Sequence, residues 1–220
     1  MKNTSRRKPS ELGIAGFYTE KSALIRDGVL KLATRVQENK KKYDKNTVLI
    51  TGCNTGNGAT MIAVNLAITM AQSGMRTLLI DTDLYKGSIH DNGLSDFFLL
   101  DTNITQVVRA SNISNLDFVP RGVRMESPAL FLGSEKMAGF IRKAKAFYDY
   151  VIVDCAPITT SPDALALLFE IDGIALICSL NNTSKMQLKK AKSIIEPYAD
   201  KYYGVVVNSL DEKHYKRLYT

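Results

Sequence analysis

The residues best suited to chemistry in this sequence are a glycine-rich segment and three carboxylates that follow apolar runs. The glycine-rich segment, residues 52–60, reads GCNTGNGAT. A loop of this kind between a strand and a helix offers backbone N–H groups and a positive helix terminus to phosphate groups. Asp81 and Asp83 follow the run LLI, and Asp154 follows YVIV. Carboxylates in such positions can bind a divalent cation or accept a proton, so the pattern indicates phosphate and metal chemistry.

The glycine-rich segment departs from the phosphate-loop pattern G-x-x-x-x-G-K-[ST] at the lysine. Gly58 matches the last glycine and Thr60 matches the hydroxyl residue that binds a metal ion. Ala59 stands where the pattern has lysine. A lysine in a dry site stabilises the transferring phosphate by several kcal/mol, so its absence is expected to lower turnover by orders of magnitude.

The elements around these residues alternate between strands and helices. The run 47–51 predicts a strand, the stretch from the loop to Gly74 a helix, and residues 76–80 a second strand. Together they form a βαβ unit, which implies a parallel sheet. Further strands are predicted at 116–119, 150–153, 173–178 and 204–207, and further helices at 19–42, 135–146, 161–169 and 183–196.

The predicted strands are apolar along their whole length rather than alternating. Such strands are typical of a sheet that has helices on both faces. We therefore predict an α/β fold, with a doubly wound, mostly parallel sheet in a three-layer α/β/α sandwich. Ligands bind at the carboxyl ends of the strands in such folds, so the polar residues at those ends should converge. They are Thr51, Asp81, Asp83, Asp154 and Asn208.

Length and composition suit a single globular domain. The chain has 220 residues, of which 45% are hydrophobic and 23% are charged, so it can bury a substantial core. Its 3 cysteines are far apart, which argues against a disulfide framework or a zinc site and favours a reducing compartment. No hydrophobic segment follows the basic N-terminus, and no apolar run of about 18 residues occurs. We therefore expect a cytoplasmic protein without a membrane helix of its own.

The net charge of +7 is concentrated near the N-terminus. Residues 1–45 contain 12 Lys and Arg against 5 acidic residues, whereas residues 46–220 contain 17 of each sign. This basic segment points to an anionic partner, which could be a membrane surface, an acidic protein tail or nucleic acid. A solvated tail beside a polar helix face would give the same pattern, and both interpretations stay open.

In these motifs the sequence resembles the bacterial tyrosine kinases of capsular and exopolysaccharide biosynthesis. These are P-loop ATPases that work with a membrane-bound chain-length adaptor. The resemblance runs from about Glu20 to Asn208. LLIDTDLYKGSIH (78–90) is similar to the family's second Walker motif, and FYDYVIVDCAP (147–157) to its Walker B motif. SPALFLGSEKM (127–137) resembles the family's P-x-ELL-x-S segment.

The resemblance implies a P-loop NTPase-like fold and a role for each candidate residue. Backbone amides of the loop would hold the phosphates of ATP, and Thr60 and Asp83 would hold Mg²⁺. Asp81 would be the base for an attacking tyrosine hydroxyl, and Asp154 would support the metal shell. Asn208 would contact adenine, with an exposed loop asparagine as the plain alternative. The implied nucleotide-binding residues are Gly56, Asn57, Gly58, Ala59, Thr60 and Asn208, and the catalytic candidates are Asp81, Asp83 and Asp154.

Besides Ala59, the sequence departs from the family at other points, which include Thr55, Tyr85 and Gly87, the oligomerisation motif and the C-terminal tyrosines. The family's oligomerisation motif E-x-x-R-x-x-R appears here as Glu20, Ala23 and Arg26, so its first arginine is lost. The C-terminal tyrosine cluster that the family phosphorylates is also reduced. Its remaining phosphorylation candidates are Tyr215 and Tyr219.

These departures lead to three hypotheses. The first is a degenerate member of the family, a nucleotide- or partner-binding regulator of polysaccharide synthesis with weak or no kinase activity. The second is an active ATP-dependent tyrosine autokinase in which another cation, with Lys86 nearest in the sequence, replaces the lysine. The third is a partition-like ATPase. Partition ATPases carry an additional lysine near the start of the phosphate loop. Asn54 stands at that position here, which counts against the third hypothesis.

The expected organisation is a basic flexible arm (1–18) followed by one P-loop kinase-like domain (19–220). The domain would comprise an amphipathic helix at 19–42, a nucleotide-binding core at 46–210 and a tyrosine-containing tail at 211–220. The resemblance implies a membrane adaptor as partner and no nucleic acid. Because the arm can add attraction to anionic lipid, the expected location is cytoplasmic and peripheral at the inner face of the membrane.

Overall fold

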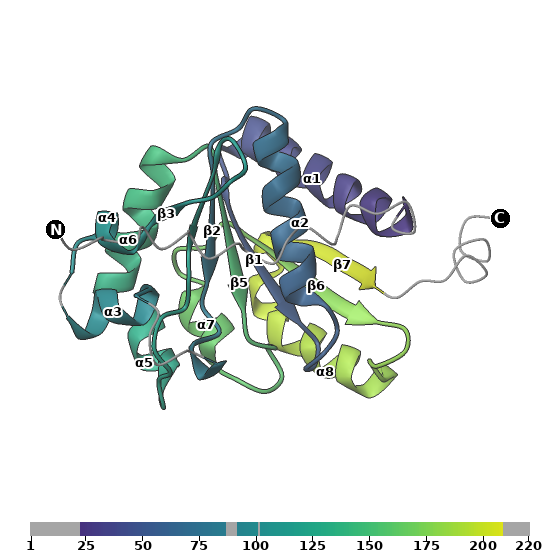
Figure 1. The fold of residues 1–220 in the computed structure, drawn as a ribbon. Helices are drawn as coiled ribbons and strands as arrows, with labels where there is room; N and C mark the ends of the chain where they lie inside the picture. The colour runs from purple at the N-terminus through teal and green to yellow at the C-terminus, as the bar shows by residue number, and fades with distance from the viewer. Residues whose placement is uncertain (1–22, 87–91, 101, 209–220) are drawn as a thin grey trace, which may run out of the picture.

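Seven strands form one sheet within the part of the chain that the structure describes (Figure 1). This computed structural model describes residues 23–86, 92–100 and 102–208. The strands stand in the order β3-β4-β2-β5-β1-β6-β7; β3 pairs antiparallel with β4, and the other pairs are parallel. Their bounds are β1 (Thr47–Gly52), β2 (Thr77–Asp81), β3 (Arg109–Ala110), β4 (Leu116–Val119), β5 (Tyr150–Cys155), β6 (Gly173–Ser179) and β7 (Tyr202–Asn208).

Helices connect the parallel strands, as crossover connections in such sheets require. The α-helices are α1 (Ala23–Tyr43), α2 (Ala59–Gln72), α3 (Leu94–Leu99), α4 (Ile104–Val107), α5 (Pro128–Leu132), α6 (Glu135–Phe147), α7 (Asp163–Leu167) and α8 (Lys185–Ile195). The described ranges also contain the short 3₁₀ helices η2 (Leu84–Lys86) and η3 (Glu196–Lys201).

Helices α1 and α2 cover one face of the sheet. Val29 and Val36 of α1 and Leu66 of α2 are buried in one cluster with Val48 and Ile50 of β1. On α1 the buried positions recur at helical spacing, so a single apolar stripe of this helix faces the core. The opposite side of α1 is charged and exposed, which is why an otherwise basic helix can pack here.

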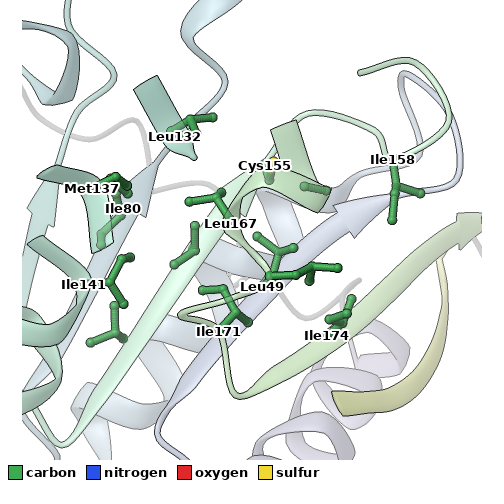
Figure 2. Packing of buried hydrophobic residues seen from close by; sticks show 14 of the residues in the cluster. Leu49, Ile80, Leu132, Met137, Ile141, Cys155, Ile158, Leu167, Ile171 and Ile174 are labelled. Carbon is green, nitrogen blue, oxygen red and sulfur yellow. The ribbon is translucent and has the colours of Figure 1, made fainter. Parts of the chain in front are cut away.

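Helices α5, α6 and α7 lie on the other face, together with α8. Leu132, Met137 and Leu167 of these helices are buried in the same cluster as Leu49 of β1 and Ile80 of β2 (Figure 2). Successive side chains of a strand point to opposite faces of the sheet. Leu49 therefore packs in this cluster, whereas Val48 and Ile50 pack in the cluster on the α1 and α2 side. Every residue of β1, β5 and β6 is buried. The predicted doubly wound α/β/α sandwich is therefore confirmed.

Some short elements differ from the sequence prediction. The helix predicted at 161–169 is limited to α7, and Phe169 beyond it is 86% exposed. Helices α3 and α4 and strand β3 were not predicted, because runs of two to six residues are too short to show a periodicity. Strand β7 starts before residue 204, because Tyr202 already pairs with Ile174 of β6.

Several predictions fall on residues that the structure does not describe. They concern the basic arm (1–18), Glu20 and the tail with Tyr215 and Tyr219. Within the described ranges, no helix combines the length and the apolar character needed to cross a membrane. The three cysteines are buried and free, so the absence of a disulfide framework is as predicted.

Candidate functional site

The glycine-rich loop joins β1 to α2 at the carboxyl edge of the sheet. Gly56 and Gly58 have φ angles of 78° and 87°, in the left-handed region that favours glycine. Glycine is also required sterically at position 58, because a Cβ there would lie 2.1 Å from Nδ2 of Asn208. Helix α2 begins at the next residue, Ala59, so its first backbone N–H groups face the loop. The loop therefore has the backbone form of an anion site at a helix N-terminus.

Asn57 braces this loop from the inside. Its side chain is buried, and its Nδ2 donates a hydrogen bond of 2.9 Å to the carbonyl oxygen of Ile177 in β6. Its Oδ1 accepts a hydrogen bond of 3.2 Å from the N–H of Ala59. A Cβ on Gly52 would lie 2.1 Å from Asn57 Nδ2, so the glycine at the end of β1 makes room for this amide. Asn57 is predicted to bind nucleotide, and the structure adds a role for its side chain in holding the loop.

Two more asparagines tie the loop to the ends of β6 and β7. Asn208 donates a hydrogen bond of 2.9 Å from Nδ2 to the carbonyl oxygen of Asn57. Asn54 donates a hydrogen bond of 3.0 Å to the carbonyl oxygen of Asn182 and accepts one of 2.7 Å from the hydroxyl of Thr183. The structure therefore places Asn208 beside the loop. The side chain of Asn54 is used in hydrogen bonds to other residues of the protein.

The three predicted carboxylates lie side by side at the same edge. Asp81 ends β2 and is the register partner of Asp154 in β5. Asp83 follows two residues later, and its N–H donates a hydrogen bond of 3.1 Å to Oδ1 of Asp81. The hydroxyl of Thr60 lies near enough to the carboxyl group of Asp154 to act on its pKa, in the lowering direction. Because β1 and β5 are neighbouring parallel strands, the loop that follows β1 lies next to Asp154, so the phosphate loop and the acidic cluster form one site.

Asp154 occupies a poorly solvated position in this cluster. Its side chain is buried, and its Oδ1 has no hydrogen-bond partner among the described residues. Burial, with a smaller contribution from the charge of Asp81, raises the pKa of Asp154 to about 7. Burial also raises the pKa of Asp81 above its ordinary value. Such a pair of crowded acids favours either a proton or a cation between them.

Two cationic side chains already face the carboxylates. Arg121 donates two hydrogen bonds to Oδ2 of Asp81, from Nε at 2.8 Å and from Nη2 at 2.5 Å. Nζ of Lys86 lies 2.5 Å from Oδ2 of Asp83. The side chain of Lys86 is 60% exposed and that of Arg121 is 27% exposed, so solvent screens the Arg121 pair less. The sequence analysis missed Arg121, because no motif links it to Asp81, 40 positions away.

The residues present fit Mg²⁺ bound through shared ligands rather than in a complete protein cage. Within the described ranges, no group of three or more His, Cys, Asp or Glu side chains is arranged to hold a metal ion. Mg²⁺ in nucleotide sites usually takes one or two carboxylates and completes its shell with water and phosphate oxygens. The unpaired Oδ1 of Asp154 and the exposed hydroxyl of Thr60 offer such oxygens. The carboxylate of Asp83 can provide a further oxygen ligand when it separates from Lys86.

A fourth acidic residue, Asp163 at the start of α7, was not predicted. It is fully buried, and both of its carboxyl oxygens are without a hydrogen-bond partner among the described residues. Burial raises its pKa, and the charge of Asp83 adds to the rise, so Asp163 lies near the acidic cluster. In the sequence it looks like an ordinary first-turn acid of a helix, which hides its burial.

Other predicted positions lie elsewhere. Thr51 is buried, and its hydroxyl donates a hydrogen bond of 2.8 Å to the carbonyl oxygen of Ala156, so it serves the packing of β1 against β5. Its place at a strand end was correct, but its side chain does not join the carboxylates. Tyr215 and Tyr219 lie outside the described residues.

The chain is similar to known proteins over much of its length. The AAA domain family matches residues 45–186, a range that includes the phosphate loop and the three carboxylates. The tyrosine-protein kinase YwqD of Bacillus subtilis (strain 168) is 34% identical over 197 residues, which cover 86% of this chain and 83% of the relative.

Two solved structures have the same fold. The crystal structure of the chimerical protein CapA2B2 superposes with a TM-score of 0.79 at 26% identity and covers 88% of each chain. The kinase domain of the Escherichia coli tyrosine kinase ETK superposes with a TM-score of 0.80 at 21% identity, over 96% of this chain and 86% of that one. Together with the motifs at the carboxyl edge, these matches show that the chain belongs to the bacterial tyrosine kinase family of P-loop ATPases.

Proposed function

We propose that this chain is a degenerate tyrosine-kinase-like protein, a nucleotide- or partner-binding regulator of polysaccharide synthesis with weak or no kinase activity. The observation that carries the proposal is the contrast within the loop. Gly56 and Gly58 keep the backbone form that receives phosphate, while Ala59 offers no charge. Backbone N–H groups can bind a phosphate in its ground state, whereas phosphoryl transfer needs the developing charge to be neutralised. We therefore expect nucleotide binding to be retained while catalysis is weak or lost.

In this proposal the contacts to ATP come from the loop and the acidic edge. Backbone N–H groups from Gly56 to Thr60 hold the phosphates, and Thr60 and Asp83 hold Mg²⁺, which when bound neutralises phosphate charge. Asp154 supports the metal shell. Nδ2 of Asn208 already donates to the loop, so a contact with adenine requires that hydrogen bond to be shared or exchanged.

The proposed partner is a membrane chain-length adaptor, and the proposed location is peripheral at the inner face of the cell membrane. Membership of the kinase family supports the adaptor, and the concentration of basic residues in positions 1–45 supports an anionic surface. Each basic residue near an anionic leaflet contributes about 1 kcal/mol, and attachment to a membrane-bound adaptor raises the effective concentration further.

Vesicle co-sedimentation tests this location. The full chain is compared with a chain that starts at Thr19, using anionic vesicles at low and at physiological salt. We expect the full chain to bind more strongly and with a strong salt dependence, because the attraction is electrostatic. Equal binding by both chains would show that residues 1–18 are only a solvated tail.

A working autokinase is the second candidate, and the cations at the acidic edge favour it. In this reaction the tyrosine oxygen bonds to the terminal phosphorus of ATP while the bond from that phosphorus to the bridging oxygen breaks and ADP leaves. The phenolic proton passes to Asp81, whose pKa is raised by burial. Arg121 and Lys86 provide positive charge near the site of transfer. This candidate requires Asp81 to separate from Arg121.

The partition-like hypothesis has less support. Asn54 stands at the position of the additional lysine in that group. It is neutral, and its amide is used in hydrogen bonds to residues 182 and 183.

Nucleotide binding, measured by calorimetry with and without Mg²⁺, is the first test of the proposed function. The second is autophosphorylation in the presence of the cytoplasmic tail of the adaptor. We expect measurable ATP binding and little or no phosphotyrosine. Robust phosphorylation of the wild-type chain would favour the autokinase instead, and absence of both nucleotide and adaptor binding would refute the proposal.

A further inference from the structure

Arg121 stands at the carboxyl edge of the sheet, beside Asp81 of the acidic cluster. It follows β4 by two residues, and Val119 at the end of β4 is the register partner of Ile80, the neighbour of Asp81. The charge of Arg121 also acts on the pKa of Asp154, in the lowering direction. Asp154 lies on β5, which stands between β2 and β1 in the sheet, so the guanidinium is close to the carboxylates that border the phosphate loop.

The backbone around Arg121 is held in place by the start of α3. The N–H of Leu94 donates a hydrogen bond of 2.8 Å to the carbonyl oxygen of Pro120, and the N–H of Ser95 donates one of 3.0 Å to that of Arg121. Gly122 has a φ of 80°, and a Cβ there would lie 2.3 Å from Oγ of Ser95. The segment 120–122 is therefore anchored to the start of α3, which fixes where the arginine side chain starts.

The pairing with Asp81 leaves the guanidinium able to bind another anion. An arginine has five N–H donors in a planar fork. Two of them are used in the hydrogen bonds to Oδ2 of Asp81, which are the hydrogen bonds of this side chain to the described residues. The side chain is 27% exposed, so the other donors can be reached from solvent. Arginine binds phosphate oxygens through two donors at once and keeps its charge at all physiological pH values.

We infer that Arg121 binds the terminal phosphate of a nucleoside triphosphate in this site and supplies part of the positive charge that Ala59 lacks. The inference rests on the proposed function, because it adds a ligand contact to the same site. Lys86 is the weaker candidate. Its side chain is 60% exposed, and it pairs with Asp83 only three residues away on the same turn. Its position is therefore set by its own turn rather than by an anchored neighbour.

Calorimetric titration of the full chain with ATP and with ADP tests the inference. The variants are Arg121→Ala, Arg121→Lys and a matched control, Arg76→Ala. Arg76 also pairs with an aspartate, Asp149 at 3.3 Å, but at the amino edge of the sheet. We expect Arg121→Ala to weaken ATP binding about tenfold or more and ADP binding less than about threefold, since the contact is to the terminal phosphate. The ATP affinity of Arg121→Lys should lie between those of the wild type and Arg121→Ala. The ATP affinity of Arg76→Ala should equal that of the wild type.

The ratio of ATP to ADP affinity separates this role from a purely structural one. Because Arg121→Ala leaves Asp81 without its cation, the double variant Arg121→Ala/Asp81→Asn removes both charges and should show the same loss of preference for ATP. An equal loss for both nucleotides, no loss, or tighter ATP binding would overturn the inference and leave Arg121 as a partner of Asp81 alone. Those results leave the proposed function intact. A wild-type chain that binds neither nucleotide would overturn the inference together with the nucleotide-binding part of that function.

Discussion

The phosphate loop and the acidic edge of this protein are stabilised in opposite ways. The loop is held by neutral groups, with glycines at positive φ and the buried amide of Asn57 bonded to β6. The acidic edge is held by charge, with Asp81 paired to Arg121 and Asp83 paired to Lys86. A backbone loop does not depend on the charge at position 59, whereas crowded, buried carboxylates cannot stay ionised without cations.

In the proposed function, this difference separates nucleotide binding from catalysis within one site. The form of the loop can persist after the lysine is lost, because its hydrogen bonds and φ angles come from other residues. The acidic edge keeps the groups that a metal ion and a transferred phosphate need, but its charges are already partly matched within the chain. Four substitutions can test how far the two regions are independent.

The largest effect is expected from Ala59→Lys. A cation at this position should tighten ATP binding and raise any hydrolysis or autophosphorylation by about tenfold or more, because it compensates the outer phosphates in a poorly solvated site. ATP titration and a phosphotyrosine assay measure the two effects. Ala59→Met, which has a long side chain without charge, is the control. Robust wild-type turnover that Ala59→Lys leaves unchanged would contradict the degenerate reading of the loop.

Gly58→Ala should damage the loop more than a comparable glycine substitution elsewhere. The left-handed backbone costs an alanine about 1–2 kcal/mol, and the new Cβ also meets Asn208, which should weaken ATP binding as well. Gly74→Ala is matched, since its φ is 84° but a Cβ there meets nothing within 4 Å. Urea unfolding of both variants measures the difference. Equal losses of stability would show that Asn208 moves aside at no cost.

The charge of Asp154 should make stability fall as pH rises. Its pKa in the folded protein is about 7, above the ordinary value of 3.8, so between these values the folded state binds more protons than the unfolded state. The free energy of unfolding therefore decreases as pH increases through this window. Asp154→Asn stays neutral, so it should flatten this dependence and gain about 1–2 kcal/mol at pH 8.

Urea unfolding at pH 5 and pH 8 measures the effect of Asp154→Asn. Asp149→Asn is a suitable control, because the pKa of Asp149 is shifted in the opposite direction. Burial acts to raise this pKa, but the hydrogen bonds and the charge of Arg76 lower it below its ordinary value. Because the pKa of Asp149 is lowered, its protonation changes stability only at pH values below about 5. This control should therefore leave the difference in stability between pH 5 and pH 8 unchanged. An unchanged pH dependence in Asp154→Asn would mean that Asp154 is solvated and ionised throughout.

The smallest effect is expected from Lys86→Ala. The side chain of Lys86 is 60% exposed, although Asp83 is buried, so removal of the lysine should change the free energy of unfolding by at most about 0.5 kcal/mol and ATP affinity by less than about threefold. Urea unfolding and ATP titration measure both quantities. A loss of ATP binding as large as that expected for Arg121→Ala would identify Lys86 as the replacement cation.

Much of the fold could be predicted because it depends on local patterns. The apolar runs of β1, β5 and β6 are buried on both faces, and this burial is why they lack alternation. The order of strands and helices then leaves few possible topologies, since crossovers between parallel strands share one hand. The antiparallel strand β3 was not predictable, because its 2 residues are defined only by pairing with β4.

For the site, the sequence by itself determined the loop, its missing lysine and the three carboxylates, because motif spacing and strand ends are local properties of the chain. Only the tertiary structure decided which groups face them. Arg121 reaches Asp81 across 40 positions, and Asn208 reaches Asn57 across 151. Asp163 is buried beside the cluster with no local sign of it. Partners of this kind depend on the packing of distant segments and on solvent exclusion, which arise only when the whole chain folds.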